Sequence, residues 1–171
     1  MDRSLGVFVW GPIAIGIWRG ECDAASVKRL ESAAMQALHH SPAAAGLIGI
    51  IEPTAPPPSA EMRKASAASN DRMAEHGLVG IAGVFARSGF AGSIARGVIT
   101  GLSLLSRARY PFKVFETHVE GARWLAELIE KKSKHFDAVE CARAVGQFRL
   151  QYENFWTAHY GPVSGSSRLG A

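Results

Sequence analysis

The sequence predicts an α/β fold: a mixed five-stranded sheet with helices packed on it. Three observations lead to this prediction. Apolar runs of strand length alternate with amphipathic runs of helix length, the connections between them are short, and a glycine–proline turn divides the first apolar run in two. The expected order is β-β-α-β-α-β-α-β-α plus an extra C-terminal helix. Right-handed crossovers make successive strands parallel, so only the opening hairpin is expected to be antiparallel.

The opening hairpin is expected at residues 5–10 and 13–19, joined by Gly11 and Pro12. In its second strand the isoleucines at 13, 15 and 17 recur with the period of two that is typical of a strand. Asp23 is then suited to cap an amphipathic helix of about 16 residues, ending near His39 and His40.

The rest of the chain continues the alternation. The apolar runs at 46–52, 78–86 and 112–116 predict buried strands. The proline-rich segment 53–58 predicts an exposed, stiff loop. Helices are expected at 60–76 after a Ser59 cap, at about 91–108, after the capping box of Thr117 and Glu120, and from Asp137 to about 159.

The composition is that of an ordinary folded domain. The chain has 171 residues, of which 47% are hydrophobic and 20% charged, and its formal net charge is +4. Disorder of the whole chain is excluded, because it needs low hydrophobicity and high net charge. Residues 1–135 are expected to form the α/β domain, and residues 136–171 an aromatic-rich helical extension with a disordered tail.

The run from Lys113 to Thr117, followed by Glu120 to Leu125, resembles the STAS family (sulfate transporter and anti-sigma factor antagonist), most closely its small bacterial STAS and Sec14-like members. The strand at 13–18 and the loop IIEPTAPPPS at 50–59 are similar as well. The resemblance implies a non-enzymatic regulatory or scaffolding module that binds a protein partner.

The resemblance also implies candidate phosphoacceptors, because some family members are phosphorylated at the N-terminus of the helix after the third strand. The matching region of this chain holds Thr54 and Ser59. A phosphate there would meet free backbone N–H groups and the positive end of the helix dipole. However, phosphorylated members carry an Asp-Ser pair directly after the strand, where this chain has Glu52, Pro53 and Thr54. Plain helix capping is the alternative role of Ser59.

Basic residues gather in a window without acidic residues. Between Glu75 and Glu116 there is no Asp or Glu. Such a patch is typical of a surface that binds an acidic partner, a phosphorylated ligand or an anionic lipid, and its alternative is a solvated face. Together with a glycine turn, residues 87–109 give a second candidate function, a binder of small anionic ligands or lipids. The patch consists of Arg87, Arg96, Arg107 and Arg109.

The last helix carries an aromatic stripe that must be covered, because its exposure would leave a large apolar patch. It either folds back on the domain or forms an interface with a protein partner or a second copy of the chain. Six of the chain's fifteen aromatic residues lie in 136–160. The candidate interface residues are Phe148, Tyr152, Phe155 and Trp156.

Other classes of function find little support in the sequence. Nucleic-acid binding is not expected, since the net charge is small and no aromatic residues interleave with the arginines. The histidines lack metal-ligand spacing and no catalytic motif occurs, so we expect neither a cofactor, a metal nor an enzyme.

The compartment is inferred from cysteines and apolar runs. Cys22 and Cys141 are isolated, as is typical of free thiols in a reducing cytoplasm. The apolar run at 5–18 is broken by Gly11 and Pro12 and does not match a signal peptide. No other apolar run approaches the ~20 residues of a membrane span, so a cytoplasmic protein is expected.

Overall fold

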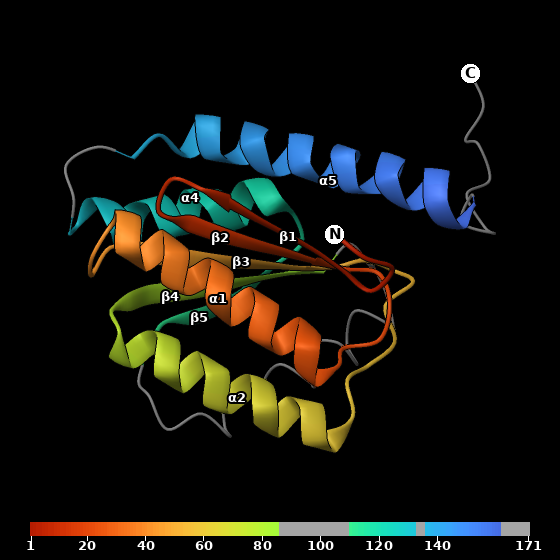
Figure 1. Cartoon of the computed structure of the whole chain (residues 1–171). Helices are drawn as coiled ribbons and strands as arrows, with labels where there is room; N and C mark the ends of the chain where they lie inside the picture. The colour runs from red at the N-terminus through yellow and green to blue at the C-terminus, as the bar shows by residue number, and fades with distance from the viewer. Residues whose placement is uncertain (86–109, 133–135, 162–171) are drawn as a thin grey trace.

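The computed structural model describes residues 1–85, 110–132 and 136–161, and within them it confirms the predicted fold class. One sheet contains five strands in the order β1-β2-β3-β4-β5 (Figure 1). β1 and β2 are antiparallel, and the pairs β2–β3, β3–β4 and β4–β5 are parallel. The strands run consecutively across the sheet, so β1 and β5 are the outermost of the described strands.

The opening hairpin forms because the side chains of each strand alternate between the two faces of the sheet and the turn between the strands is tight. β1 (Leu5–Trp10) pairs with β2 (Ile13–Trp18) in an unbroken register, from Leu5 opposite Trp18 to Trp10 opposite Ile13. Gly11 adopts a φ of +51° in the turn, in the left-handed region that glycine enters at little cost. The alternation sends Val7 and Val9 to one face of the sheet and Phe8 and Trp10 to the other.

One face of the sheet is covered by the first two helices. α1 (Ala24–His40) follows β2, and α2 (Ala60–Glu75) follows β3 (Ala45–Ile51). Asp23 caps α1 by accepting a hydrogen bond from the backbone N–H of Ser26, at 2.7 Å. The core on this face contains Leu30, Ala34 and Leu38 of α1 against Leu47 of β3.

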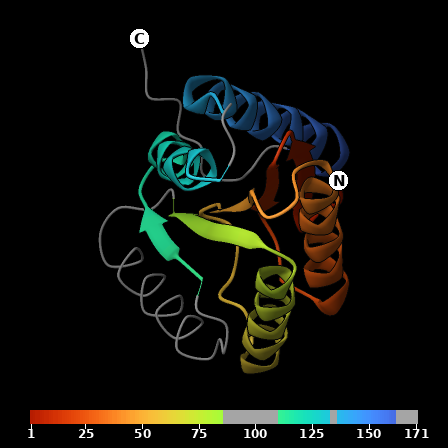
Figure 2. The same cartoon turned by 90° about the vertical axis from the view of Figure 1, so that its left-hand side faces the viewer.

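The opposite face is covered by the last two helices, as Figure 2 shows. α4 (His118–Glu130) follows β5 (Phe112–Phe115), and α5 (Ala138–Tyr160) completes the described chain. Between these helices and the sheet lies the larger core, with Ile15, Ile48 and Val84 from β2, β3 and β4 (Leu78–Phe85). Cys141, Val145 and Tyr152 of α5 belong to this same core, so residues 136–160 share their packing with the domain.

The predicted boundaries agree with the structure to within a residue or two. The predicted helix at 91–108 lies outside the described residues, as does the predicted tail. The expected capping box is present: Thr117 Oγ1 accepts from the Glu120 N–H at 3.2 Å, and Glu120 Oε2 accepts from the Thr117 N–H at 3.1 Å. Among the helices that the structure describes, none is both long enough and apolar enough to cross a bilayer.

Candidate interaction surface

The aromatic stripe of α5 anchors this helix across the N-terminal part of the chain. The Phe148 ring stacks on Phe8 of β1, with centroids 4.6 Å apart and ring planes within 9°. The Tyr152 hydroxyl donates to the backbone carbonyl of Asp2 at 2.8 Å, and Trp156 Nε1 donates to that of Arg3 at 3.1 Å. These contacts hold α5 along one side of β1.

For Tyr152 this packing matches the other alternative that the sequence left open, in which the stripe folds back on the domain. The Tyr152 side chain is 0% exposed and lies in the core, so it does not form part of an outer interface in this fold. Phe148, Phe155 and Trp156 are half-buried and pack against this core, and their binding of a partner stays a prediction. The large apolar side chains that α5 does expose are instead Val139, Leu150 and Tyr160.

Two ion pairs add to the anchoring at the carboxyl ends of β2 and β3. Arg19, which is only 8% exposed, pairs with Glu153 of α5 at 2.7 Å. Its guanidinium also lies over the Tyr152 ring, 5.7 Å from the centroid, where a cation is attracted by the π face. Glu52, 7% exposed, accepts two hydrogen bonds from Arg149 of α5.

A histidine lies beside the second ion pair. His118 is the first residue of α4, and a Cβ placed on Gly146 of α5 would lie 3.6 Å from its Nε2. Burial lowers the pKa of His118 and the positive charge of Arg149 lowers it further, while Glu52 opposes both. In this cluster each carboxylate is already paired with a guanidinium, so the arrangement acts as a clamp between α5 and the sheet.

Among the described residues, the side of β1 that faces away from β2 pairs with no strand. The Arg19 N–H donates to the Ser4 carbonyl at 2.9 Å, so the Ser4 carbonyl points toward β2. Along an antiparallel strand the backbone N–H and C=O groups of successive residues point to opposite sides. The backbone groups of Gly6 and Phe8 therefore point toward β2, whereas those of Leu5, Val7 and Val9 point away from it.

The outward-pointing backbone groups of Leu5 already have hydrogen-bond partners within the chain. The Leu5 N–H donates to the Asp2 carboxylate at 2.9 Å, and the Leu5 carbonyl accepts from the Asp2 N–H at 3.3 Å. Within residues 1–85, 110–132 and 136–161, the outward N–H and C=O groups of Val7 and Val9 have no hydrogen-bond partner. Four backbone groups therefore remain for another strand.

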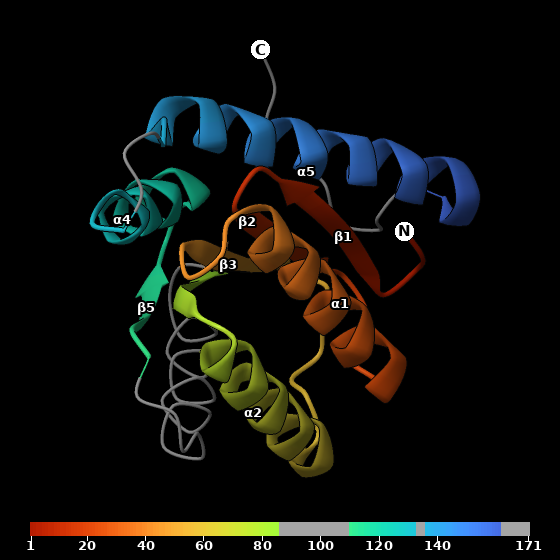
Figure 3. The same cartoon turned by 60° about the vertical axis from the view of Figure 1, so that its left-hand side comes forward.

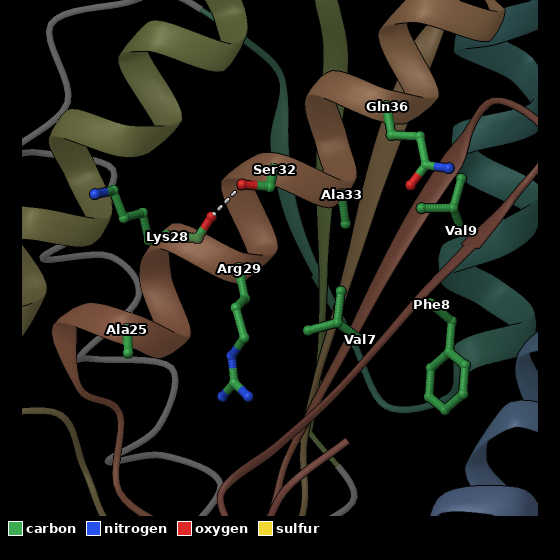
Figure 4. Close-up of a pocket in the computed structure, with 9 residues that line it drawn as sticks. All are labelled: Val7, Phe8, Val9, Ala25, Lys28, Arg29, Ser32, Ala33 and Gln36. Atoms are coloured by element: carbon green, nitrogen blue, oxygen red, sulfur yellow. Dashed lines mark hydrogen bonds between the residues drawn. The ribbon is translucent and has the colours of Figure 1, made fainter.

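These backbone groups lie beside a groove. β1 lies between α1 and α5 (Figure 3), and an open groove of about 730 Å³ runs between β1 and α1 (Figure 4). Its apolar side is formed by Val7 and Val9 with Ala25 and Ala33 of α1. The polar residues that line it are Lys28, Arg29, Ser32 and Gln36.

The charges along the groove are positive. Arg29 pairs with the carboxylate of Asp2 in the same chain, and Lys28 lies at the exposed rim. Ser32 turns its hydroxyl back to its own helix, where it donates to the Lys28 carbonyl at 2.9 Å. The groove thus offers one apolar strip and four backbone groups, with the positive charge of Lys28 at its rim.

The other sequence-based candidates lie elsewhere. Thr54 and Ser59 are both exposed, and Ser59 Oγ accepts from the Met62 N–H at 3.2 Å as the cap of α2. Phosphorylation at either residue stays a prediction. The patch residues Arg87, Arg96, Arg107 and Arg109 lie outside the described residues.

The β1–α1 groove and the α5 clamp escape sequence reasoning, because both depend on which elements become neighbours. One signal was available for the groove: the run LGVFVW contains no charged residue and no proline, which edge strands commonly use to prevent pairing. The clamp had no such signal, since its partners are 97 and 134 residues apart.

Comparisons of the chain with protein-family models, with curated proteins and with solved structures find no match. In the part of the chain that the structure describes, no three histidine, cysteine or acidic side chains lie close enough together to hold a metal ion.

Proposed function

We propose that this chain is a regulatory or scaffolding interaction module that binds another polypeptide strand along the free edge of β1. The observation that carries the proposal is the row of backbone groups of Val7 and Val9 beside the groove. An extended segment laid along β1 would gain main-chain hydrogen bonds, and its alternate side chains would enter the groove against α1.

The character of β1 supports this role. Edge strands are commonly protected by charges, prolines or bulges, and the register of β1 with β2 contains no irregularity. α5 fixes β1 from the other side through Phe148 and Tyr152, so the edge is rigid before a partner arrives. A preorganised edge loses little conformational entropy on binding.

The resemblance to STAS domains points to the same class of function. That family supplies the expectation of a non-enzymatic module with a protein partner. The clamp of Glu52 with Arg149 and of Arg19 with Glu153 fits a structural use of the carboxyl ends of the strands, where an α/β enzyme would place reacting groups.

A photo-cross-linking amino acid at Ser32 tests the proposal. This side chain is exposed on the groove, and the matched control places the same cross-linker at Glu127, an exposed position on α4. We expect a cross-linked partner from cells at Ser32 and not at Glu127. The partner should disappear in a Val9→Pro variant, which lacks the outward N–H, and persist in Val9→Thr, which keeps it.

The mass of the adduct identifies the partner. An adduct of twice the chain mass indicates a second copy, and any other mass indicates a different protein. Cross-linking that fails at Ser32, or that is unaffected by Val9→Pro in a folded variant, would overturn the proposal.

A further inference from the structure

We infer that the strand bound at this edge is β1 of a second copy, so that two chains join their sheets through antiparallel β1–β1 pairing about a two-fold axis at Phe8. The inference rests on the proposed function, since it names the partner of the same edge. It follows from the position of the free backbone groups within β1.

The edge is complementary to itself. The outward-facing groups belong to Val7 and Val9, on either side of Phe8. In an antiparallel pair centred on Phe8, Val7 of one copy lies opposite Val9 of the other, and the reverse holds by symmetry. All four free groups of each copy then find partners, and Phe8 faces its own symmetry mate as a non-hydrogen-bonded pair.

The charges beside β1 permit this arrangement. The two-fold axis places both α1 helices on the same face of the joined sheet in opposite directions. Lys28 therefore lies toward the Gln36 end of the second helix and away from the other Lys28. Arg29 is already neutralised by Asp2 within its own chain.

The available area indicates a reversible dimer. Six residues of β1 extend about 20 Å, and the layers from α1 through the sheet to α5 add about 20 Å of width. Such a strip buries on the order of 1,000 Å² in total, at the low end of specific interfaces. We therefore expect association that depends on concentration.

Two cysteine variants test the register. Phe8 and its mate are expected about 4.5 Å apart between Cα atoms, within the range of a disulfide. Phe8→Cys should therefore form a covalent dimer on mild oxidation. Val7→Cys is the matched control, because its symmetry mate lies two residues along the strand, beyond disulfide reach. The wild-type chain, with Cys22 and Cys141 present, gives the background.

The unmodified protein provides a second test that does not depend on a variant folding. In sedimentation velocity we expect a dimer that grows with concentration, that is lost in Val9→Pro and that is kept in Val9→Thr. Amide exchange at Val7 and Val9 should slow at least tenfold as the dimer forms, while that at Gly161 should not change. Circular dichroism checks that each variant is folded.

The outcomes separate the two proposals. A monomer at all concentrations with fast exchange at Val7 and Val9 overturns the dimer, and so does a dimer that Val9→Pro leaves intact. If the Ser32 cross-linker then captures a different protein in a manner sensitive to Val9→Pro, the proposed function stands with another partner. If it captures nothing, both proposals fail.

Discussion

The Arg149 guanidinium in the middle of α5 donates two hydrogen bonds to the Glu52 carboxylate, with Nε to Oε1 at 2.7 Å and Nη2 to Oε2 at 3.1 Å. Glu52 is the first residue after β3, at the carboxyl end of a central strand. The pair therefore joins the terminal helix to the middle of the sheet, where the carboxylate is largely removed from water.

Removing the arginine should be costly, because it leaves a buried carboxylate without a partner. We expect Arg149→Met to lower the free energy of unfolding by roughly 2–3 kcal/mol, measured by urea denaturation. Arg143→Met is the control: Arg143 pairs with Glu140 on the exposed face of the same helix, and its loss should cost about 0.5 kcal/mol or less. Equal losses in the two variants would contradict a buried clamp.

Substitution by alanine should change the stability of the fold in opposite directions at two glycines, one that contacts α5 and one within it. A Cβ on Gly6 of β1 would lie 2.8 Å from Cγ of Tyr152, whose ring is held by its hydrogen bond to Asp2. Gly6→Ala should therefore destabilise the fold by about 1–3 kcal/mol. Gly146→Ala places its Cβ 3.6 Å from His118 in a helix interior, so it should stabilise the protein by roughly 0.5–1 kcal/mol. Urea denaturation of both variants measures the change in the free energy of unfolding and its sign.

The local parts of the fold could be predicted from sequence because their causes lie within a few residues. Asp23, Ser59, Thr117 and Asp137 all cap the helices they were expected to cap, since a cap needs only a short side chain near free N–H groups. The period of two in the isoleucines at 13, 15 and 17 likewise predicts a strand, and β2 confirms it.

The remaining features depend on neighbours that are distant in sequence. Whether the aromatic stripe of α5 is core or interface depends on the surface that meets it, and this surface is β1 with the N-terminal residues. The free edge arises because, among the described strands, β1 pairs with β2 alone. Neither fact has a signature in the spacing of residues along the chain.

Deletion of residues 137–171 tests whether α5 belongs to the core. Because Cys141, Val145 and Tyr152 pack against the sheet, we expect the shortened chain to expose that core and to lose its cooperative thermal unfolding. Differential scanning fluorimetry with a dye for exposed apolar surface measures this. A shortened chain that still unfolded cooperatively and bound no dye would show that residues 1–136 fold alone.

The two cysteines should differ in reactivity toward a thiol reagent. Cys141 is 0% exposed, and burial raises its pKa to about 12, so it should react only as the protein unfolds. Cys22 is half-buried, and although burial also raises its pKa, the reagent can reach it. We expect one thiol to react quickly with Ellman's reagent and the other to follow the unfolding rate. Cys22→Ser should remove the fast phase; a fast phase that persists would contradict the burial of Cys141.

The position of His118 predicts a loss of stability in mild acid. Burial lowers its pKa in the folded protein below the ordinary value of 6.5, and the charge of Arg149 acts in the same direction against the weaker opposing effect of Glu52. As the pH falls below 6.5 the unfolded chain takes up a proton that the folded chain resists, so unfolding becomes easier. The contribution of His118 is therefore fully present above pH 6.5 and is lost progressively as the pH falls toward the lowered pKa.

Comparison with a His118→Gln variant isolates this contribution. Between pH 7.5 and 5.5 we expect the free energy of unfolding, from urea denaturation, to fall further in the wild type than in the variant. Four carboxyl groups with lowered pKa values titrate below this window, namely Asp2, Asp23, Glu31 and Glu120. The remaining histidines are common to both proteins and cancel in the difference. An identical fall in the two proteins would mean that His118 is not held in its neutral form beside Arg149, and that the Glu52–Arg149 pair does not depend on its protonation.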